Sequence, residues 1–153
     1  MKVFEANISY EVSDYLNSNL KNIISFELAN QKVYDACGII HFFDNNEELE
    51  TLKEIISETQ NIVEEPDRAT EYGDFQTNLD LANNVTVYLK AKDISPEIVI
   101  EPTCGKGNFI IASLQNFTNI EKVFGVEIYK PYVWETKFNI VKFFLENPDN
   151  IKP

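Results

Sequence analysis

The residues with the clearest chemical potential form a short glycine-containing run. An apolar stretch at 98–100 leads into Glu101, and a turn with Gly105 and Gly107 follows before apolar periodicity resumes at Asn108. Glycine adopts positive φ and has no Cβ to block the approach of a ligand to the backbone. In open α/β sheets, ligands bind beyond the carboxyl ends of the strands. The run therefore predicts a site for a nucleotide-like cofactor.

Three kinds of cofactor loop compete for this run. A phosphate-binding P-loop requires Gly-Lys followed by Ser or Thr, whereas the order here is Gly105, Lys106, Gly107 and Asn108. A dinucleotide loop has a third glycine where this sequence has Ile110. A loop for S-adenosylmethionine also follows the first strand, and an acid at the strand end would repel a pyrophosphate but attract a cationic sulfonium. This charge contrast favours S-adenosylmethionine.

A second carboxylate supports that interpretation. Glu127 ends the next apolar segment, and parallel strands bring their carboxyl ends to the same edge of a sheet. There it would accept hydrogen bonds from both ribose hydroxyls, and Ile128 would contact the adenine face. The same geometry serves NAD, so the spacing alone does not distinguish the two cofactors.

The sequence around these residues resembles the adenine-N6 DNA methyltransferases of restriction–modification systems. Residues 101–109 (EPTCGKGNF) are similar to the first motif of that family, and residues 124–128 (FGVEI) are similar to its second. Upstream, residues 74–78 (DFQTN) resemble the motif that precedes the first helix of the catalytic domain. The resemblance covers about residues 72–130.

The resemblance implies that S-adenosylmethionine is the cofactor and that its sulfonium methyl goes to N6 of an adenine flipped out of DNA. It places Thr77 at the methionine end of the cofactor. The cofactor-binding residues expected from the motifs are Phe75, Thr77, Glu101, Pro102, Thr103, Cys104, Gly105, Gly107, Asn108, Phe109, Glu127 and Ile128.

The sequence departs from the family at two places. The family has Pro after the threonine, whereas this chain has Asn78, which predicts a less rigid turn. The catalytic motif, two prolines and an aromatic after Asn, Asp or Ser, is absent; residues 147–149 (NPD) match it only in part. We therefore expect a truncated cofactor-binding portion without catalytic or metal-binding residues, inactive alone. The alternatives are an RNA or protein methyltransferase, or a non-catalytic cofactor-binding or scaffold remnant.

Composition sets further limits. The 153 residues include 13 basic and 25 acidic ones, which give a formal net charge of −12. Binding to the phosphates of a nucleic acid needs clustered Lys and Arg. DNA would therefore be bound mainly by another part of the parent protein. The two cysteines form no disulfide framework, and neither a signal peptide nor a long apolar run occurs, so we expect a cytoplasmic protein without a membrane partner.

The wider pattern predicts an α/β fold: a partial class I methyltransferase (Rossmann-like) sheet preceded by a small, mostly helical unit. We expect that unit at 1–65, with helices at 9–30 and 47–63 and an ambiguous stretch at 33–43, then a break near 64–74. The cofactor-binding α/β portion at 72–153 follows. Its expected elements alternate: a helix at 79–91, a strand at 97–101, a helix at 108–117, a strand at 122–128 and a helix at 132–145.

Several side chains also carry structural expectations. Trp134, Phe138, Val141 and Phe144 recur at helical spacing and should lie in the core. His41 should pack within its apolar run, Cys104 should be a small buried filler, and Thr77 is alternatively the cap of the next helix. The strand at 97–101 should be buried, with an unpaired edge that another copy of the chain or the N-terminal region would cover.

Overall fold

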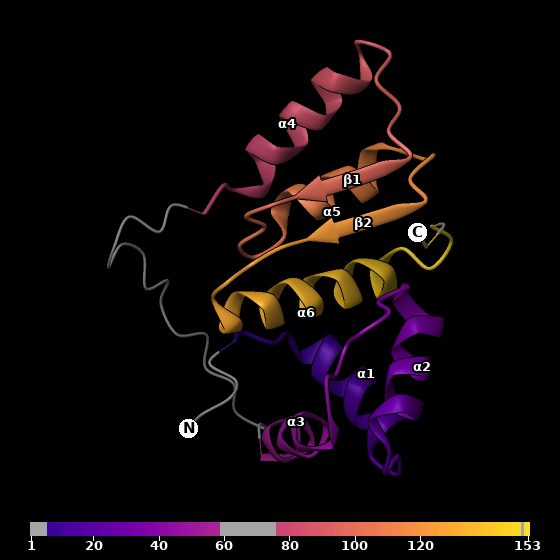
Figure 1. Cartoon of the computed structure of the whole chain (residues 1–153), viewed down its shortest axis with the longest axis vertical. Helices are drawn as coiled ribbons and strands as arrows, with labels where there is room; N and C mark the ends of the chain where they lie inside the picture. Colours follow the sequence, from indigo (N-terminus) through magenta and orange to yellow (C-terminus); the bar gives the residue numbers. More distant parts are fainter. Residues whose placement is uncertain (1–5, 59–75, 151) are drawn as a thin grey trace.

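The computed structural model describes residues 6–58, 76–150 and 152–153 (Figure 1). Three helices come first: α1 (Tyr10–Leu20), α2 (Phe26–Cys37) and α3 (Asn46–Glu58). The second half alternates as α4 (Leu79–Lys90), β1 (Ile98–Glu101), α5 (Asn108–Asn116), β2 (Lys122–Gly125) and α6 (Lys130–Glu146). This order confirms the predicted α/β alternation, and the described residues before it, 6–58, are mostly helical.

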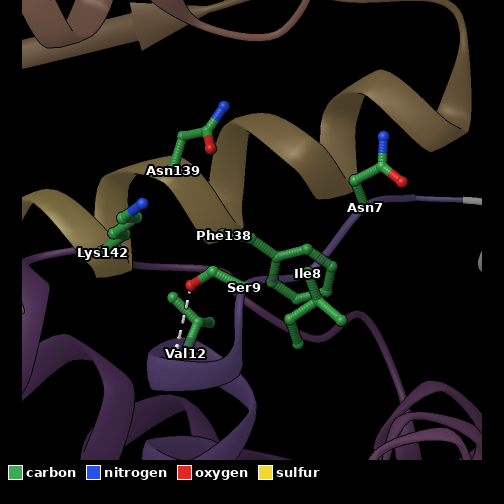
Figure 2. Close-up of a pocket in the computed structure, with 7 residues that line it drawn as sticks. All are labelled: Asn7, Ile8, Ser9, Val12, Phe138, Asn139 and Lys142. Carbon is green, nitrogen blue, oxygen red and sulfur yellow. Dashed lines mark hydrogen bonds between the residues drawn. The ribbon is translucent and has the colours of Figure 1, made fainter. Parts of the chain in front are cut away.

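The N-terminal prediction was wrong in one respect, because the helix expected at 9–30 is two helices. Ser9 caps the start of α1, and its Oγ accepts a hydrogen bond from the Val12 amide at 3.4 Å (Figure 2). The second helix, α2, begins at Phe26, whose amide donates to Asn46 Oδ1 at 2.8 Å. That contact satisfies a helix N-terminal donor from a distant part of the chain, so local periodicity did not reveal the break.

The ambiguous stretch at 33–43 is neither one helix nor a strand. Helix α2 ends at Gly38, which has φ of 76°, the left-handed conformation that often ends helices. Beyond it, Asn30 Oδ1 accepts from the amides of Phe42 and Phe43, and Asn30 Nδ2 donates to the Phe43 carbonyl. His41 is exposed, contrary to the prediction, because this backbone anchor turns its two phenylalanine neighbours inward instead.

Strands β1 and β2 pair in parallel, with Ile98 opposite Lys122 and Glu101 opposite Gly125. They form a two-stranded sheet within the described residues, which is compatible with part of the predicted Rossmann-like sheet. Helix α5 packs on one face, where a Cβ added to Gly125 would lie 2.8 Å from Ile110 Cδ1. A side chain at this position would require the end of the Ile110 side chain to shift, so helix and strand approach closely here.

The other face of the sheet is open. Ile98 is 54% exposed, Ile100 66% and Phe124 52%, and they share one face because side chains alternate along strands. The prediction that the 97–101 strand is buried was therefore wrong. Three apolar residues in a row cannot distinguish a strand covered on both faces from one covered on a single face.

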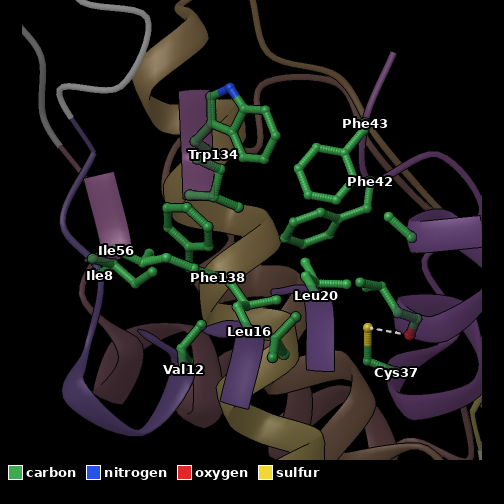
Figure 3. Close-up of a cluster of buried hydrophobic side chains, with 14 of the residues drawn as sticks. Ile8, Val12, Leu16, Leu20, Cys37, Phe42, Phe43, Ile56, Trp134 and Phe138 are labelled. Atoms are coloured by element: carbon green, nitrogen blue, oxygen red, sulfur yellow. Dashed lines mark hydrogen bonds between the residues drawn. The ribbon is translucent and has the colours of Figure 1, made fainter. Parts of the chain in front are cut away.

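The main hydrophobic cluster lies where α6 meets the N-terminal helices, and Figure 1 shows α6 between these helices and the strands. The predicted stripe on α6 is confirmed, since its members are nearly inaccessible: Trp134, Phe138, Val141 and Phe144. Trp134 and Phe138 meet the rings of Phe42 and Phe43 from the N-terminal region (Figure 3).

Helix α6 also places a half-buried cation, Lys137, beside this cluster. Lys137 Nζ lies 4.5 Å from the Trp134 ring centroid and donates to the Phe42 carbonyl at 2.8 Å. Burial lowers the pKa of Lys137, while the carboxylates of Asp44 and Glu48 act in the opposite direction. The predicted boundary between the helical region and the α/β portion falls within residues 59–75, outside the described residues. Among the helices that are described, none is long and apolar enough to cross a membrane.

Candidate functional site

The glycine loop between β1 and α5 is a tight, hydrogen-bonded turn. The Val126 amide donates to the Glu101 carbonyl and the Cys104 amide donates to the Val126 carbonyl, each at 2.9 Å. The Gly107 amide then donates to the Cys104 carbonyl at 2.7 Å. The turn thus extends the pairing of the two strands and delivers the chain directly into helix α5.

Both glycines of the loop adopt positive φ, 52° at Gly105 and 83° at Gly107. Other residues are strained in this conformation, so the backbone itself explains the glycines. Their surroundings add a second reason. A Cβ on Gly107 would lie 2.8 Å from Thr136 Cγ2, and one on Gly105 would collide with the carboxamide of Gln76.

Glu127 lies against the loop, as the sequence predicted. Its Oε2 accepts from the Gly105 amide at 3.0 Å and its Oε1 accepts from the Tyr129 amide at 2.7 Å. Burial raises the pKa of the Cys104 thiol, and the nearby carboxylates of Glu127 and Glu101 raise it further. Both acids therefore act on one point of the loop, and Cys104, half-buried, stays a protonated thiol at neutral pH.

The upstream segment also lies on the loop. Gln76 Oε1 accepts from the Lys106 amide at 3.1 Å, and Asn108 Nδ2 donates to the Thr77 carbonyl at 2.7 Å. Thr77 is not the helix cap: Asn78 caps the N-terminus of α4, and its Oδ1 accepts from the Leu81 amide at 2.8 Å. The turn expected to be less rigid at Asn78 thus has a side-chain cap that proline cannot provide. Phe75 lies outside the described residues.

The remaining predicted residues border the loop. Pro102 and Thr103 are exposed and Phe109 is half-buried, whereas Ile128 is fully exposed just beyond β2. Asn147, from the partial match to the catalytic motif, caps the C-terminus of α6, and its Nδ2 donates to the Phe143 carbonyl. Its carboxamide therefore serves as part of a helix terminus.

Helix α6 supplies two loop contacts that sequence reasoning missed. Thr136 Oγ1 donates to the Gly105 carbonyl at 2.7 Å, and Asn139 Nδ2 donates to the Lys106 carbonyl at 2.8 Å. The two residues are three apart, so they lie on the same side of the helix. In the sequence, the only indication of this contact was a pair of polar residues three apart, next to the predicted aromatic stripe.

A separate hollow of about 180 Å³ lies between the N-terminal segment and α6 (Figure 2). Its lining residues are Asn7, Ile8, Ser9, Val12, Phe138, Asn139 and Lys142. This set contains none of the predicted cofactor-binding residues. The hollow is also smaller than the roughly 300 Å³ at which ligand pockets usually begin. The glycine loop therefore remains the candidate site.

Comparison with known proteins gives one partial similarity. No protein-family model and no solved structure matches the chain. The type II methyltransferase M.NspV from Nostoc sp. is 49% identical over 67 residues, which are 44% of this chain. The matched segment spans 14% of the length of that relative. At least part of this chain is therefore similar to part of a type II restriction–modification methyltransferase.

Proposed function

We propose that this chain is the S-adenosylmethionine-binding portion of a DNA adenine-N6 methyltransferase. The observation that carries the proposal is the glycine loop with Glu127 hydrogen-bonded to its backbone. The similarity to a type II methyltransferase supports a methyltransferase function, and the motif resemblance supplies adenine N6 as the target. S-adenosylmethionine, when bound, supplies a methyl group activated by a positively charged sulfur.

The residues around the loop suit such a cofactor. Each carboxylate oxygen of Glu127 accepts one backbone N–H and keeps a second lone pair, which can accept from a ribose hydroxyl. The exposed Ile128 offers an apolar surface to an adenine ring. Glu101 and Glu127 together place negative charge beside the loop, which favours a sulfonium over a pyrophosphate.

Gln76 occupies part of the same loop. Its carboxamide oxygen accepts from the Lys106 amide and fills the space where Gly105 lacks a Cβ. We propose that Gln76 occupies the place of a ligand acceptor and moves aside when the methionine end of the cofactor reaches the loop. Truncating Gln76 to Ala should therefore strengthen cofactor binding.

DNA recognition and the catalytic residues belong, in this proposal, to polypeptide outside this chain. Asn147, the residue that partly matches the catalytic motif, caps a helix through its side chain. The net charge of −12 opposes binding to the phosphates of DNA. We expect the chain alone to transfer no labelled methyl groups to DNA. Measured transfer to DNA by the pure chain would overturn this part of the proposal.

The open face of the sheet is proposed to be a contact surface in the intact assembly. Its exposed apolar side chains continue beyond the strands through Val126, which is 58% exposed, to Ile128. An apolar face with a free strand edge favours pairing with another polypeptide. We propose that a second copy of the chain covers it when the chain is studied alone.

Calorimetric titration tests the cofactor assignment. The chain should bind S-adenosylmethionine and its demethylated product, with NAD and ATP as comparisons that should not bind. Glu127→Ala should weaken binding about tenfold or more, because it removes a charged hydrogen-bond acceptor. The matched control is Glu121→Ala, an exposed acid one residue before β2. Failure of the wild-type chain to bind, or equal losses in both variants, would contradict the proposal.

A further inference from the structure

Glu135 on helix α6 is a buried carboxylate that the proposed function does not use. The residue is 7% exposed. Its Oε1 accepts from the Asn7 backbone amide at 3.3 Å, and its Oε2 lies 3.5 Å from Lys106 Nζ. One partner thus belongs to the N-terminal segment and the other belongs to the glycine loop.

A buried carboxylate is costly unless it is paired and hydrogen-bonded. Because Glu135 has partners in two distant segments, displacing either segment exposes the carboxylate to that cost. The Lys106 ammonium is also held 5.6 Å from the Tyr132 ring centroid, on the same helix one turn earlier. The side chain of Lys106 is therefore fixed on α6 while its backbone remains in the loop.

The backbone of the loop is held by the same helix. Thr136 and Asn139 donate to the carbonyls of Gly105 and Lys106, so the loop rests on one surface of α6. Asn139 also lines the hollow beside Asn7, which Figure 2 shows next to the helix. The N-terminal segment and the loop thus contact neighbouring residues of one rigid element.

We infer that Glu135 is a positioning residue that couples the seating of the N-terminal segment to the shape of the glycine loop. The coupling is a property of the chain itself, and its consequence for ligand affinity rests on the proposed function. Through Glu135, the N-terminal region thereby helps to set the shape of the proposed cofactor site. Weakening its contact with Glu135 loosens the loop although no ligand contact is removed.

Amide hydrogen exchange of the ligand-free chain tests the coupling directly. Glu135→Gln keeps the side-chain shape but removes the charge facing Lys106, and it should accelerate exchange of the Gly105, Lys106 and Gly107 amides about tenfold. Glu146→Gln removes an exposed ion pair with Lys142 on the same helix, at a residue that does not line the hollow, and should leave these amides unchanged. Equal exchange in both variants would overturn the inference.

The N-terminal partner needs its own pair of variants. Asn7→Pro deletes the backbone N–H that donates to Glu135, whereas Asn7→Ala retains it. Only the proline variant should accelerate exchange in the loop. A proline effect confined to residues 6–12, with normal exchange in the loop, would show that no coupling exists.

Ligand affinity separates this inference from the proposed function. Thr136→Val removes the hydroxyl that donates to the Gly105 carbonyl, and Thr136→Ser restores it. In titrations with S-adenosylmethionine, Glu135→Gln and Thr136→Val should weaken binding several-fold, and Thr136→Ser should recover it. No binding by the wild-type chain contradicts the proposed function, whereas the exchange result still decides the coupling. Binding unaffected by Glu135→Gln and Thr136→Val overturns the positioning role.

Discussion

The two sides of the β1–β2 sheet differ sharply in how their side chains are used. On the α5 side, Gly125 lies close to Ile110, and the adjoining loop is hydrogen-bonded to Glu127, Thr136 and Asn139. On the opposite side, Ile100 and Phe124 are more than half exposed. The same two strands therefore border an ordered site on one side and an apolar surface open to solvent on the other.

This difference separates what holds the loop from what completes the fold. The loop is held by α6, by the upstream segment at Gln76 and by Glu127 after β2. The cluster beneath α6 is built from residues at opposite ends of the chain. Changes on the α6 side should therefore alter stability and the loop together, whereas changes on the open face should alter association.

The largest effect is expected in the core beneath α6. Trp134 is 1% exposed and meets the rings of Phe42, Phe43 and Phe138. Trp134→Ala should lower the free energy of unfolding by about 3–5 kcal/mol because it leaves a cavity. Urea denaturation followed by circular dichroism measures this loss. An equal loss from Phe124→Ala on the open face would erase the contrast between the two sides.

The next effect concerns Gly107. Gly107→Ala places a residue with a Cβ at positive φ, with that Cβ directed at Thr136. It should lower the free energy of unfolding by about 1–3 kcal/mol and weaken the binding of S-adenosylmethionine at the loop. The matched control is Gly38→Ala, at φ of 76° but at the end of α2. Thermal unfolding should register both changes, whereas calorimetric titration should register only the first. Reduced affinity in both variants would show that general destabilisation explains the result.

A smaller effect depends on pH. Burial raises the pKa of Glu48, but the Asp44 amide and the Lys130 ammonium together outweigh it and leave the pKa below the ordinary 4.5. With a lowered folded pKa, the stabilisation is complete above 4.5 and is lost as the pH falls through the folded value. Denaturant titrations at stepped pH should show that Glu48→Gln lowers stability at pH 7, with the difference shrinking below pH 4.5. A constant difference would contradict this sign.

The smallest effect on stability is expected on the open face. Phe124→Ser should lower the free energy of unfolding by only about 1 kcal/mol, because half of the ring is already exposed. It should nevertheless shift sedimentation from an associated species toward the monomer. A wild-type chain that remains monomeric at high concentration would contradict the proposed contact surface.

Much of the α/β half was predictable because its signals are local. The alternation of helix and strand, the glycine turn and the aromatic stripe of α6 all follow from short-range periodicity. The position of Glu127 beside the loop followed from parallel strand geometry alone, and the structure brings it within 3.0 Å of the Gly105 amide. That the loop holds S-adenosylmethionine stays a prediction.

The rest depends on contacts between distant residues. The break between α1 and α2 involves Asn46, and the turned-out His41 follows from the anchoring of its neighbours by Asn30. Thr136 and Asn139 could not be assigned to the loop without knowing how α6 crosses it. The open sheet face was missed because a strand with three consecutive apolar residues does not reveal how many of its faces are covered.

The position of the single tryptophan has a practical consequence. Trp134 lies in the seam between α6 and the N-terminal helices, under the Lys137 ammonium, and the next two residues of the chain hold the glycine loop. The wavelength of its fluorescence emission therefore reports on the packing between α6 and the N-terminal helices. A red shift should accompany separation of the helices, so fluorescence can follow the seating of the N-terminal region without an added label.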